Sequence, residues 1–135
     1  MKYNVTYMSG AGNLFTVINN LDGKISKELG SKLAPKLCVK SEKIEFETEG
    51  LMLLEKSDDY HFKCTFFNPD GSTGMMCGNG GRAIVKYALV NDIKDIKIAT
   101  VHSELKMFNP EMYSLLDRTL KYIPDDTFTK RAYYI

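Results

Sequence analysis

The segment Phe66–Ala88 places one cysteine, Cys77, between a turn-rich loop and the first turn of a predicted helix. A helix N-terminus carries partial positive charge and unpaired N–H groups, which lower the pKa of a thiol held there. The neighbouring glycines Gly78, Gly80 and Gly81 remove side chains from the loop, so a small ligand can approach the backbone. The same N–H groups suit a carboxylate or a phosphate. A thiol beside such a site is suited to chemistry at the carbon next to a carboxylate.

A purely structural interpretation of this segment is also open. A lone cysteine in a small protein is commonly an inert buried hydrophobe. Asn68, Asp70 and Asn79 would then be ordinary turn and cap residues. The glycines are followed by Arg82 and not by Lys-Ser or Lys-Thr, so the segment is no P-loop, and the dinucleotide fingerprint is absent as well.

Hydrophobic periodicity predicts the elements that must position this thiol. Strands are predicted over Lys2–Met8, Leu14–Asn19, Lys43–Phe46, Leu51–Glu55, His61–Phe67 and Asp95–Ala99, with a further candidate at Leu105–Phe108. Helices are predicted over Lys24–Leu33, which Pro35 is expected to stop, over about Asn79–Leu89, and over Glu111–Leu120. Turns are predicted at Asn20–Gly23 and Pro69–Ser72, and no period is visible in Arg131–Ile135. This mixture predicts an α+β fold in which short strands wrap around a central helix.

Length and composition indicate one soluble domain. The chain has 135 residues, 44% of them hydrophobic and 26% charged, with a net charge of +1. This balance gives no reason to expect a nucleic acid or an acidic membrane as partner. No apolar run approaches the roughly 20 residues that span a bilayer, and the N-terminus lacks the apolar core of a signal peptide.

We therefore expect a cytoplasmic protein. Three cysteines without paired spacing are typical of reduced thiols. His61 and His102 lack further ligands at a fixed spacing, so we expect no metal site.

Three motifs resemble the diaminopimelate epimerase family. Asn68–Ser72 followed by Met76–Arg82 is similar to the family pattern N-A-D-G-S … M-C-G-N-G-x-R. Gly10–Phe15 is similar to G-x-G-N-D-F, and Glu49–Glu55 is similar to D-G-L-M-L-L. The order and separations of the motifs fit the family over about residues 1 to 100.

The resemblance implies an epimerase of lysine biosynthesis that needs no cofactor and interconverts LL- and meso-diaminopimelate. In the family two cysteines face each other across the substrate: one thiolate removes the α-proton and the other thiol delivers one. Cys77 matches the first cysteine, Asn13 and Asn68 match substrate-binding positions, and Gly78 and Asn79 match the backbone site for the carboxylate. The implied fold is two similar α+β halves, each a curved mixed sheet around a central helix.

The sequence departs from the family in its second half. The second catalytic cysteine, in another C-G-x-G loop, and a Glu-Arg pair have no counterpart. Cys38 lies in a lysine-rich segment without a glycine loop, and Cys64 lies in a predicted strand, so neither is expected to replace it. After about Thr100 the chain no longer follows the family, which predicts an epimerase-like domain over residues 1–108 and a divergent tail over residues 109–135.

Smaller departures lie within the motifs. Ser9 and Leu14 stand where the family has histidine and aspartate, and Pro69 stands where it has alanine.

Three functions remain open on the sequence alone. The chain could be half of an epimerase that is inactive by itself, or a homodimer that places two copies of Cys77 opposite each other. It could instead be a non-catalytic binding module that keeps the fold. The tail holds half of the eight tyrosines, namely Tyr113, Tyr122, Tyr133 and Tyr134. In either catalytic case the expected partner is a small amino-acid substrate.

Overall fold

A computed structural model of the chain describes residues 1–10, 12–58, 62–73, 78–91 and 128–135. The elements are β1 (Lys2–Gly10), β2 (Asn13–Asn20), α1 (Lys27–Cys38), β3 (Leu51–Glu55), β4 (Lys63–Phe67), α2 (Gly78–Val90) and β5 (Phe128–Tyr134). The predictions for Asp95–Ala99, Leu105–Phe108 and Glu111–Leu120 lie outside the described residues. None of the helices within the described residues is long and apolar enough to cross a membrane.

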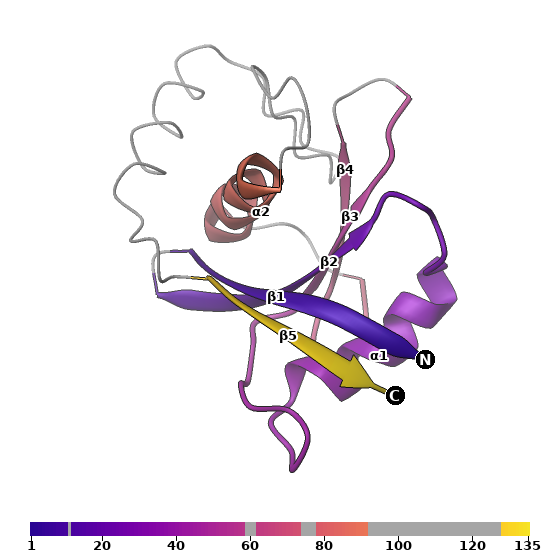
Figure 1. The fold of residues 1–135 in the computed structure, drawn as a ribbon, viewed down its shortest axis with the longest axis vertical. Coiled ribbons are helices and arrows are strands. Elements are labelled where there is room, and N and C mark those ends of the chain that lie inside the picture. The colour runs from indigo at the N-terminus through magenta and orange to yellow at the C-terminus, as the bar shows by residue number, and fades with distance from the viewer. Residues whose placement is uncertain (11, 59–61, 74–77, 92–127) are drawn as a thin grey trace.

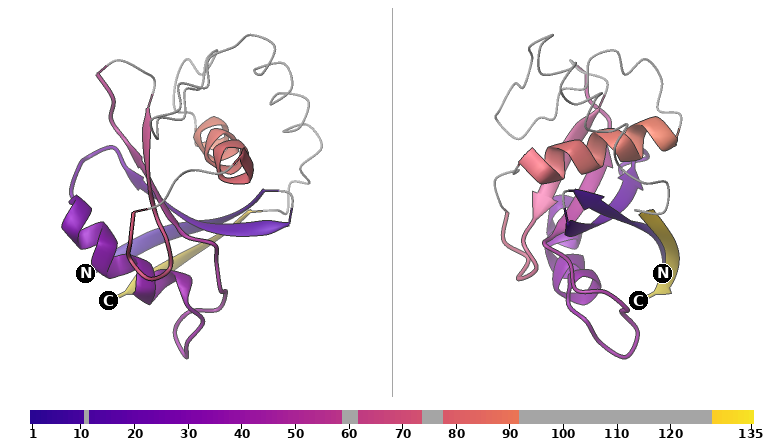
Figure 2. Two further views of the ribbon diagram at one scale, coloured as in Figure 1. Left: turned by 180° about the vertical axis from the view of Figure 1, so that it is seen from behind. Right: turned by 90° about the vertical axis from the view of Figure 1, so that its left-hand side faces the viewer.

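The five strands form one mixed sheet in the order β4-β3-β2-β1-β5. β2 and β3 are parallel, with Thr16 opposite Leu51, and every other neighbouring pair is antiparallel. The sheet curves around α2, and α1 lies on its opposite face (Figures 1 and 2). The predicted fold, a curved mixed sheet around a central helix in the α+β class, is confirmed.

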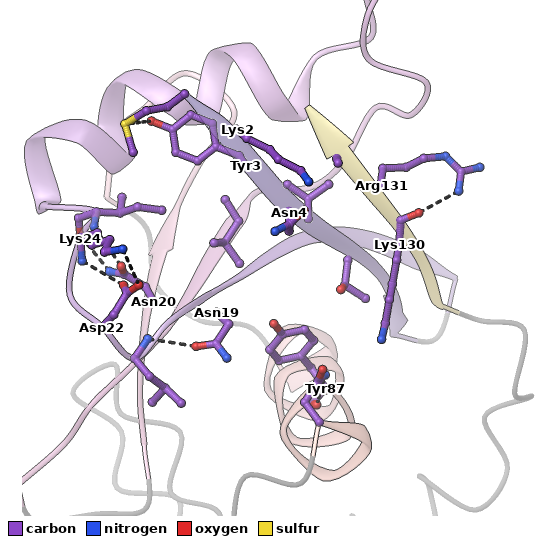
Figure 3. Close-up of a pocket in the computed structure, with 18 residues that line it drawn as sticks. Lys2, Tyr3, Asn4, Asn19, Asn20, Asp22, Lys24, Tyr87, Lys130 and Arg131 are labelled. Atoms are coloured by element: carbon purple, nitrogen blue, oxygen red, sulfur yellow. Dashed lines mark hydrogen bonds and ion pairs between the residues drawn. The ribbon is translucent and has the colours of Figure 1, made fainter. Parts of the chain in front are cut away.

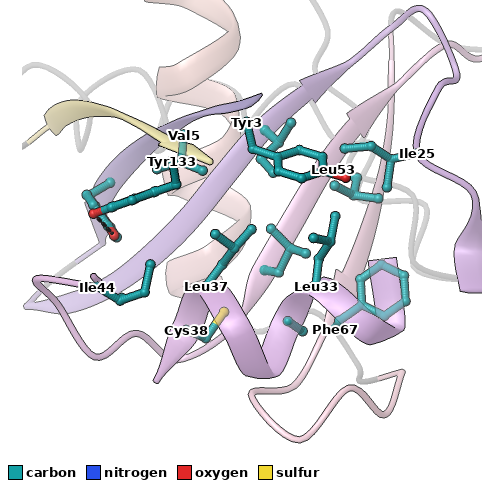
Figure 4. Packing of buried hydrophobic residues seen from close by; sticks show 14 residues of the cluster. Tyr3, Val5, Ile25, Leu33, Leu37, Cys38, Ile44, Leu53, Phe67 and Tyr133 are labelled. Carbon is teal, nitrogen blue, oxygen red and sulfur yellow. Dashed lines mark hydrogen bonds between the residues drawn. The ribbon is translucent and has the colours of Figure 1, made fainter. Parts of the chain in front are cut away.

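Strand alternation divides the core between the two faces of the sheet. One cluster packs against α2 and includes Met8, Phe15, Met52 and Phe66 together with the helix residues Ala83, Ile84, Tyr87 and Ala88. The other cluster packs against α1 and includes Leu33, Leu37, Leu53, Phe67 and Tyr133 (Figure 4). Because β3 is covered on both faces, its first four residues are all buried, as its continuous apolar run predicts.

The predicted bounds of α1 were wrong at both ends. The helix begins at Lys27, because the Ser26 hydroxyl accepts a hydrogen bond from the Leu29 N–H at 3.1 Å and caps it. It continues through Pro35 to Cys38.

The free energy gained by burying two leucines explains why Pro35 does not stop the helix. A proline inside a helix costs about 3 kcal/mol. Leu33 and Leu37 are 3% and 0% exposed, and burying a leucine contributes about 1.5–3 kcal/mol each. Pro35 itself lies on the exposed side of the helix, so the buried side keeps its packing.

The strand predicted at Lys43–Phe46 is absent from this part of the described chain. Here the backbone turns back over α1: the Ser41 N–H donates to the Ile44 carbonyl at 3.1 Å, and the Thr48 N–H donates to the Cys38 carbonyl at 2.9 Å. The apolar residues of this segment pack in a loop and not in a strand. Ile44 is buried, and the Phe46 ring meets the Tyr7 ring edge-on, with 5.0 Å between the ring centroids.

β5 was not predicted from the sequence. It pairs with β1 along its whole length, and only Tyr133 is buried among its last five residues. An edge strand that leaves most side chains in water has no apolar period to detect. β5 lies within the predicted tail, and the boundary between residues 108 and 109 stays a prediction because it falls outside the described residues.

Candidate functional site

The strand register brings two predicted site residues, Asn13 and Asn68, to the same end of the sheet. Asn13 is the first residue of β2, and the neighbouring parallel strand β3 begins at Leu51. β4 runs the opposite way and ends at Phe67, directly opposite Leu51, so Asn68 follows at this same end. Both asparagines are half-buried. By alternation Asn13 shares the sheet face of Phe15, which is the face that α2 covers.

Gly50, in the third motif, allows β4 to approach this end closely. A side-chain carbon at Gly50 would lie 2.5 Å from the Phe67 carbonyl oxygen, which no real packing tolerates. The glycine in the D-G-L-M-L-L pattern is therefore required for packing against Phe67, the residue before Asn68.

The loop Asn68–Ser72 is closed by backbone hydrogen bonds and contains the turn predicted at Pro69–Ser72. The Asn68 N–H donates to the Ser72 carbonyl at 2.7 Å, and the Gly71 N–H donates to the Asn68 carbonyl at 2.9 Å. Gly71 has a φ of +89°, a value that favours glycine. A β-bridge between Phe67 and Thr73 closes the base of the loop.

Hydrogen bonds inside the loop orient the Asn68 side chain. The Ser72 hydroxyl lies 2.6 Å from the Asp70 carboxylate, which also accepts from the Ser72 N–H at 2.9 Å. These two bonds lower the pKa of Asp70, so its carboxylate only accepts. The Ser72 hydroxyl must therefore donate its single hydrogen to Asp70, and it accepts a hydrogen bond from the Asn68 Nδ2 at 3.0 Å. Among the described residues the Asn68 Oδ1 has no hydrogen-bond partner.

The C-terminal end of α2 is placed by the residues that it contributes to a groove. Tyr87 and Asn91, at its C-terminal end, line a groove at the far end of the sheet, where β1 begins and β2 ends. The helix has 13 residues and is therefore about 20 Å long. Its N-terminus therefore lies away from this groove.

Gly78 and Asn79 are the first two residues of α2, so their N–H groups have no partner within the helix. The first turn contains no acidic residue that would neutralise the helix end. Cys77 directly precedes Gly78 and lies outside the described residues. The roles of Cys77, Asn13, Asn68, Gly78 and Asn79 stay predictions.

The other two cysteines are poor acid/base groups. Cys38 and Cys64 are 0% and 2% exposed, and burial raises the pKa of both thiols. Cys64 lies in a strand, as predicted, and packs in the cluster against α2. Burial therefore keeps both thiols protonated at neutral pH.

A groove of about 920 Å³ lies at the opposite end of the sheet (Figure 3). It exists because β1 and β2 pair only from Thr6 and Val17 to Gly10 and Asn13 and separate beyond that point. Burial raises the pKa of Tyr87, which lines the groove, to about 12. None of the predicted site residues is among those that line the groove, so this groove is not the predicted site.

A metal site is not supported by side chains in the described ranges. No three of the His, Cys, Asp and Glu residues in these ranges lie close enough together to hold a metal ion. His61 and His102 lie outside these ranges.

Solved structures with a related fold belong to the PhzF family. A phenazine biosynthesis protein from Bacillus anthracis matches 72% of this chain and 31% of its own length, with a TM-score of 0.56 and 15% identity. A PhzF-family protein from Enterococcus faecalis matches 72% of this chain and 35% of its own, with a TM-score of 0.51 and 16% identity. At such identities the likeness concerns the fold alone.

Sequence comparison gives the family. The diaminopimelate epimerase family profile matches residues 5–107, and the chain belongs to this family. It is 35% identical over 112 residues to the diaminopimelate epimerase of Hydrogenobaculum sp., covering 76% of this chain and 40% of that protein. It is 42% identical over 81 residues to the enzyme of Chlorobaculum tepidum, covering 60% of this chain and 30% of that protein. The chain therefore spans about 30–40% of the length of these relatives.

Proposed function

We propose that this chain forms one half of a diaminopimelate epimerase site, in which Cys77 exchanges the α-proton of the amino acid without a cofactor. The family match over residues 5–107 includes every predicted site residue. The observation that carries the proposal is the direction of α2. With its C-terminal end at the groove, its N-terminus would face the sheet end where Asn13 and Asn68 lie, so a helix end suited to a carboxylate and two amides would face one region.

The proposed chemistry divides the work between the helix end and the thiol. The N–H groups of Gly78 and Asn79 would bind the carboxylate of the reacting centre. They would also stabilise the negative charge that develops when the weakly acidic α-proton leaves. The same helix end would lower the pKa of Cys77, which makes its thiolate available as the base. Asn68 would accept from the substrate ammonium group through Oδ1.

Inversion needs a second acid/base group on the other face of the substrate, because a single base returns the proton to the side it came from. Cys38 and Cys64, the two thiols among the described residues, are buried and protonated, so neither would supply this group. We propose a second copy of the chain as its source, with two Cys77 side chains related by a twofold axis. A single-chain mass in solution while inversion proceeds would exclude this arrangement.

The test is hydrogen exchange at the α-carbon of diaminopimelate in heavy water, followed by NMR. The chain should replace the α-proton by deuterium, and Cys77→Ala should lower the rate at least about a hundredfold. Cys38→Ala is the matched control and should exchange normally, because its thiol is buried away from the site. Exchange that survives Cys77→Ala would overturn the proposal. Binding of diaminopimelate without any exchange would identify a binding module instead.

A further inference from the structure

The loop that carries Asn68 rests on a helix from the other side of the sheet. The Ser31 hydroxyl of α1 donates to the Gly71 carbonyl at 2.6 Å. The preceding residue, Gly30, lies against the Phe67 ring, where a side-chain carbon would come within 2.7 Å of Cε2 and Cζ. Two consecutive small residues of α1 thus contact the last residue of β4 and the turn that follows it.

The backbone contact between Gly71 and Ser31 is close. A side-chain carbon at Gly71 would overlap the Ser31 carbonyl oxygen, so only glycine fits here. The φ of +89° at Gly71 is a second reason for glycine. In a regular helix the Ser31 carbonyl would accept from the N–H four residues later. That residue is Pro35, which has no N–H. Pro35 thereby frees the side of the Ser31 carbonyl that the Gly71 backbone approaches.

Ser31 and Asn68 are joined through Gly71. The Gly71 carbonyl accepts from Ser31, and the Gly71 N–H donates to the Asn68 carbonyl at 2.9 Å. Sequence reasoning assigned no role to Ser31. One local feature points to such a role. Gly30 and Ser31 lie inside a helix although both residue types have low helix propensity, which indicates that small side chains are needed there for packing.

We propose that Ser31 is a positioning residue, which holds the Asn68–Ser72 loop so that the Asn68 Oδ1 faces the substrate. The proposal rests on the function proposed above. Ser31 acts from outside the site, because α1 lies on the face of the sheet opposite to α2 (Figure 2). Removing its hydroxyl leaves every proposed substrate contact in place and loosens only the support of the loop.

The experiment uses the full chain labelled with ¹⁵N and the variants Ser31→Ala, Ser31→Thr and Ser26→Ala. Ser31→Ala should speed hydrogen exchange of the Gly71 amide by about fivefold, the effect of one modest hydrogen bond. In the α-exchange assay it should raise KM for diaminopimelate by about fivefold, with kcat little changed. Ser31→Thr keeps a hydroxyl and should restore both values.

Ser26→Ala is the control for a general loss of stability. It removes the cap of α1 but no contact to the loop, so it should lower the free energy of unfolding and leave KM unchanged. An unchanged Gly71 amide, or a Ser31→Ala effect on KM no larger than that of Ser26→Ala, would overturn the positioning role. A wild-type chain that neither binds nor exchanges diaminopimelate would instead overturn the proposed function, whatever the amide exchange shows.

Discussion

Two asparagines, at opposite ends of the sheet, use their side chains differently. Asn20 ends β2 and is 1% exposed. Its Nδ2 donates to the Ile25 carbonyl at 2.8 Å and to Glu55 Oε2 at 2.9 Å, while its Oδ1 accepts from the Ile25 N–H at 2.9 Å. Asn68 is half-buried, and its side chain makes one hydrogen bond among the described residues, to Ser72.

The difference separates a structural amide from one that can bind a ligand. Both hydrogens of Asn20 are used inside the protein, and Glu55 is held further by the Thr65 hydroxyl. Such a network fixes the turn between β2 and α1 and leaves no hydrogen of the Asn20 amide to donate to a ligand. Asn68 has one end fixed by the loop, and its Oδ1 has no partner among the described residues, as the binding role proposed for it requires.

The largest expected effect is on stability, from Asn20→Ala. The substitution leaves the Ile25 N–H and carbonyl buried without their partner and removes a donor to Glu55. We expect a loss of about 3 kcal/mol in the free energy of unfolding, because unsatisfied buried groups cost about 1–3 kcal/mol each. Urea denaturation measures this.

Asn19→Ala is the matched control, since Asn19 is exposed and, among the described residues, its side chain accepts a single hydrogen bond, from the Leu21 N–H. It should cost less than about 1 kcal/mol. Equal losses for the two variants would contradict the structural role of Asn20.

The second expected effect is on binding, from Asn68→Ala. The free energy of unfolding should fall by less than about 1 kcal/mol, because one exposed hydrogen bond is lost. KM for diaminopimelate should rise about tenfold, because a hydrogen bond to a charged group contributes about 1.5 kcal/mol or more. The α-exchange assay with varied substrate concentration measures this.

Asn68→Asp separates the two ends of the side chain. It keeps an oxygen for the substrate ammonium group and loses the donor to Ser72. A KM change as large as that of Asn68→Ala would show that the loop bond, and not the open oxygen, matters.

Much of the fold could be predicted because its pattern is local. The run Leu51–Leu54 is buried on both sides, and the helical spacing in α2 marks the face that the sheet covers. The end of α1 could not be predicted, because burial of Leu37 and Cys38 outweighs the local cost of Pro35. β5 was missed for the opposite reason, since an edge strand has little burial to reveal it.

The site was predicted as motifs and not as an arrangement. Spacing along the chain identifies the Asn68–Ser72 turn, because Gly71 supplies the backbone angle that the turn requires. The support from Ser31 crosses 40 positions of sequence and depends on how α1 packs on the sheet. The groove at the other end arises where β1 and β2 separate, which no residue pattern indicates.

The smallest expected effect is a pH dependence of the loop. The two hydrogen bonds from Ser72 lower the pKa of Asp70 below its ordinary value of 3.8. A lowered pKa in the folded state means that the bonds stabilise the loop at higher pH, and that this stability is lost as the pH falls through the lowered value. Protonated Asp70 no longer obliges the Ser72 hydroxyl to donate to it, so the constraint on the Asn68 side chain is lost as well.

The Ser72 amide chemical shift between pH 2 and 7 should therefore titrate with a midpoint below 3.8. The Asn68 Nδ2 signals should move with the same midpoint, because the Ser72 hydroxyl joins the two side chains. Asp70→Asn removes the carboxylate and should abolish both titrations while the loop backbone keeps its own bonds. Asn68 signals that stay constant while Ser72 titrates would show that the amide is held by something other than this hydroxyl. The contrast with Asn20, whose side chain is held by the bonds that the structure gives it, would then no longer apply to Asn68.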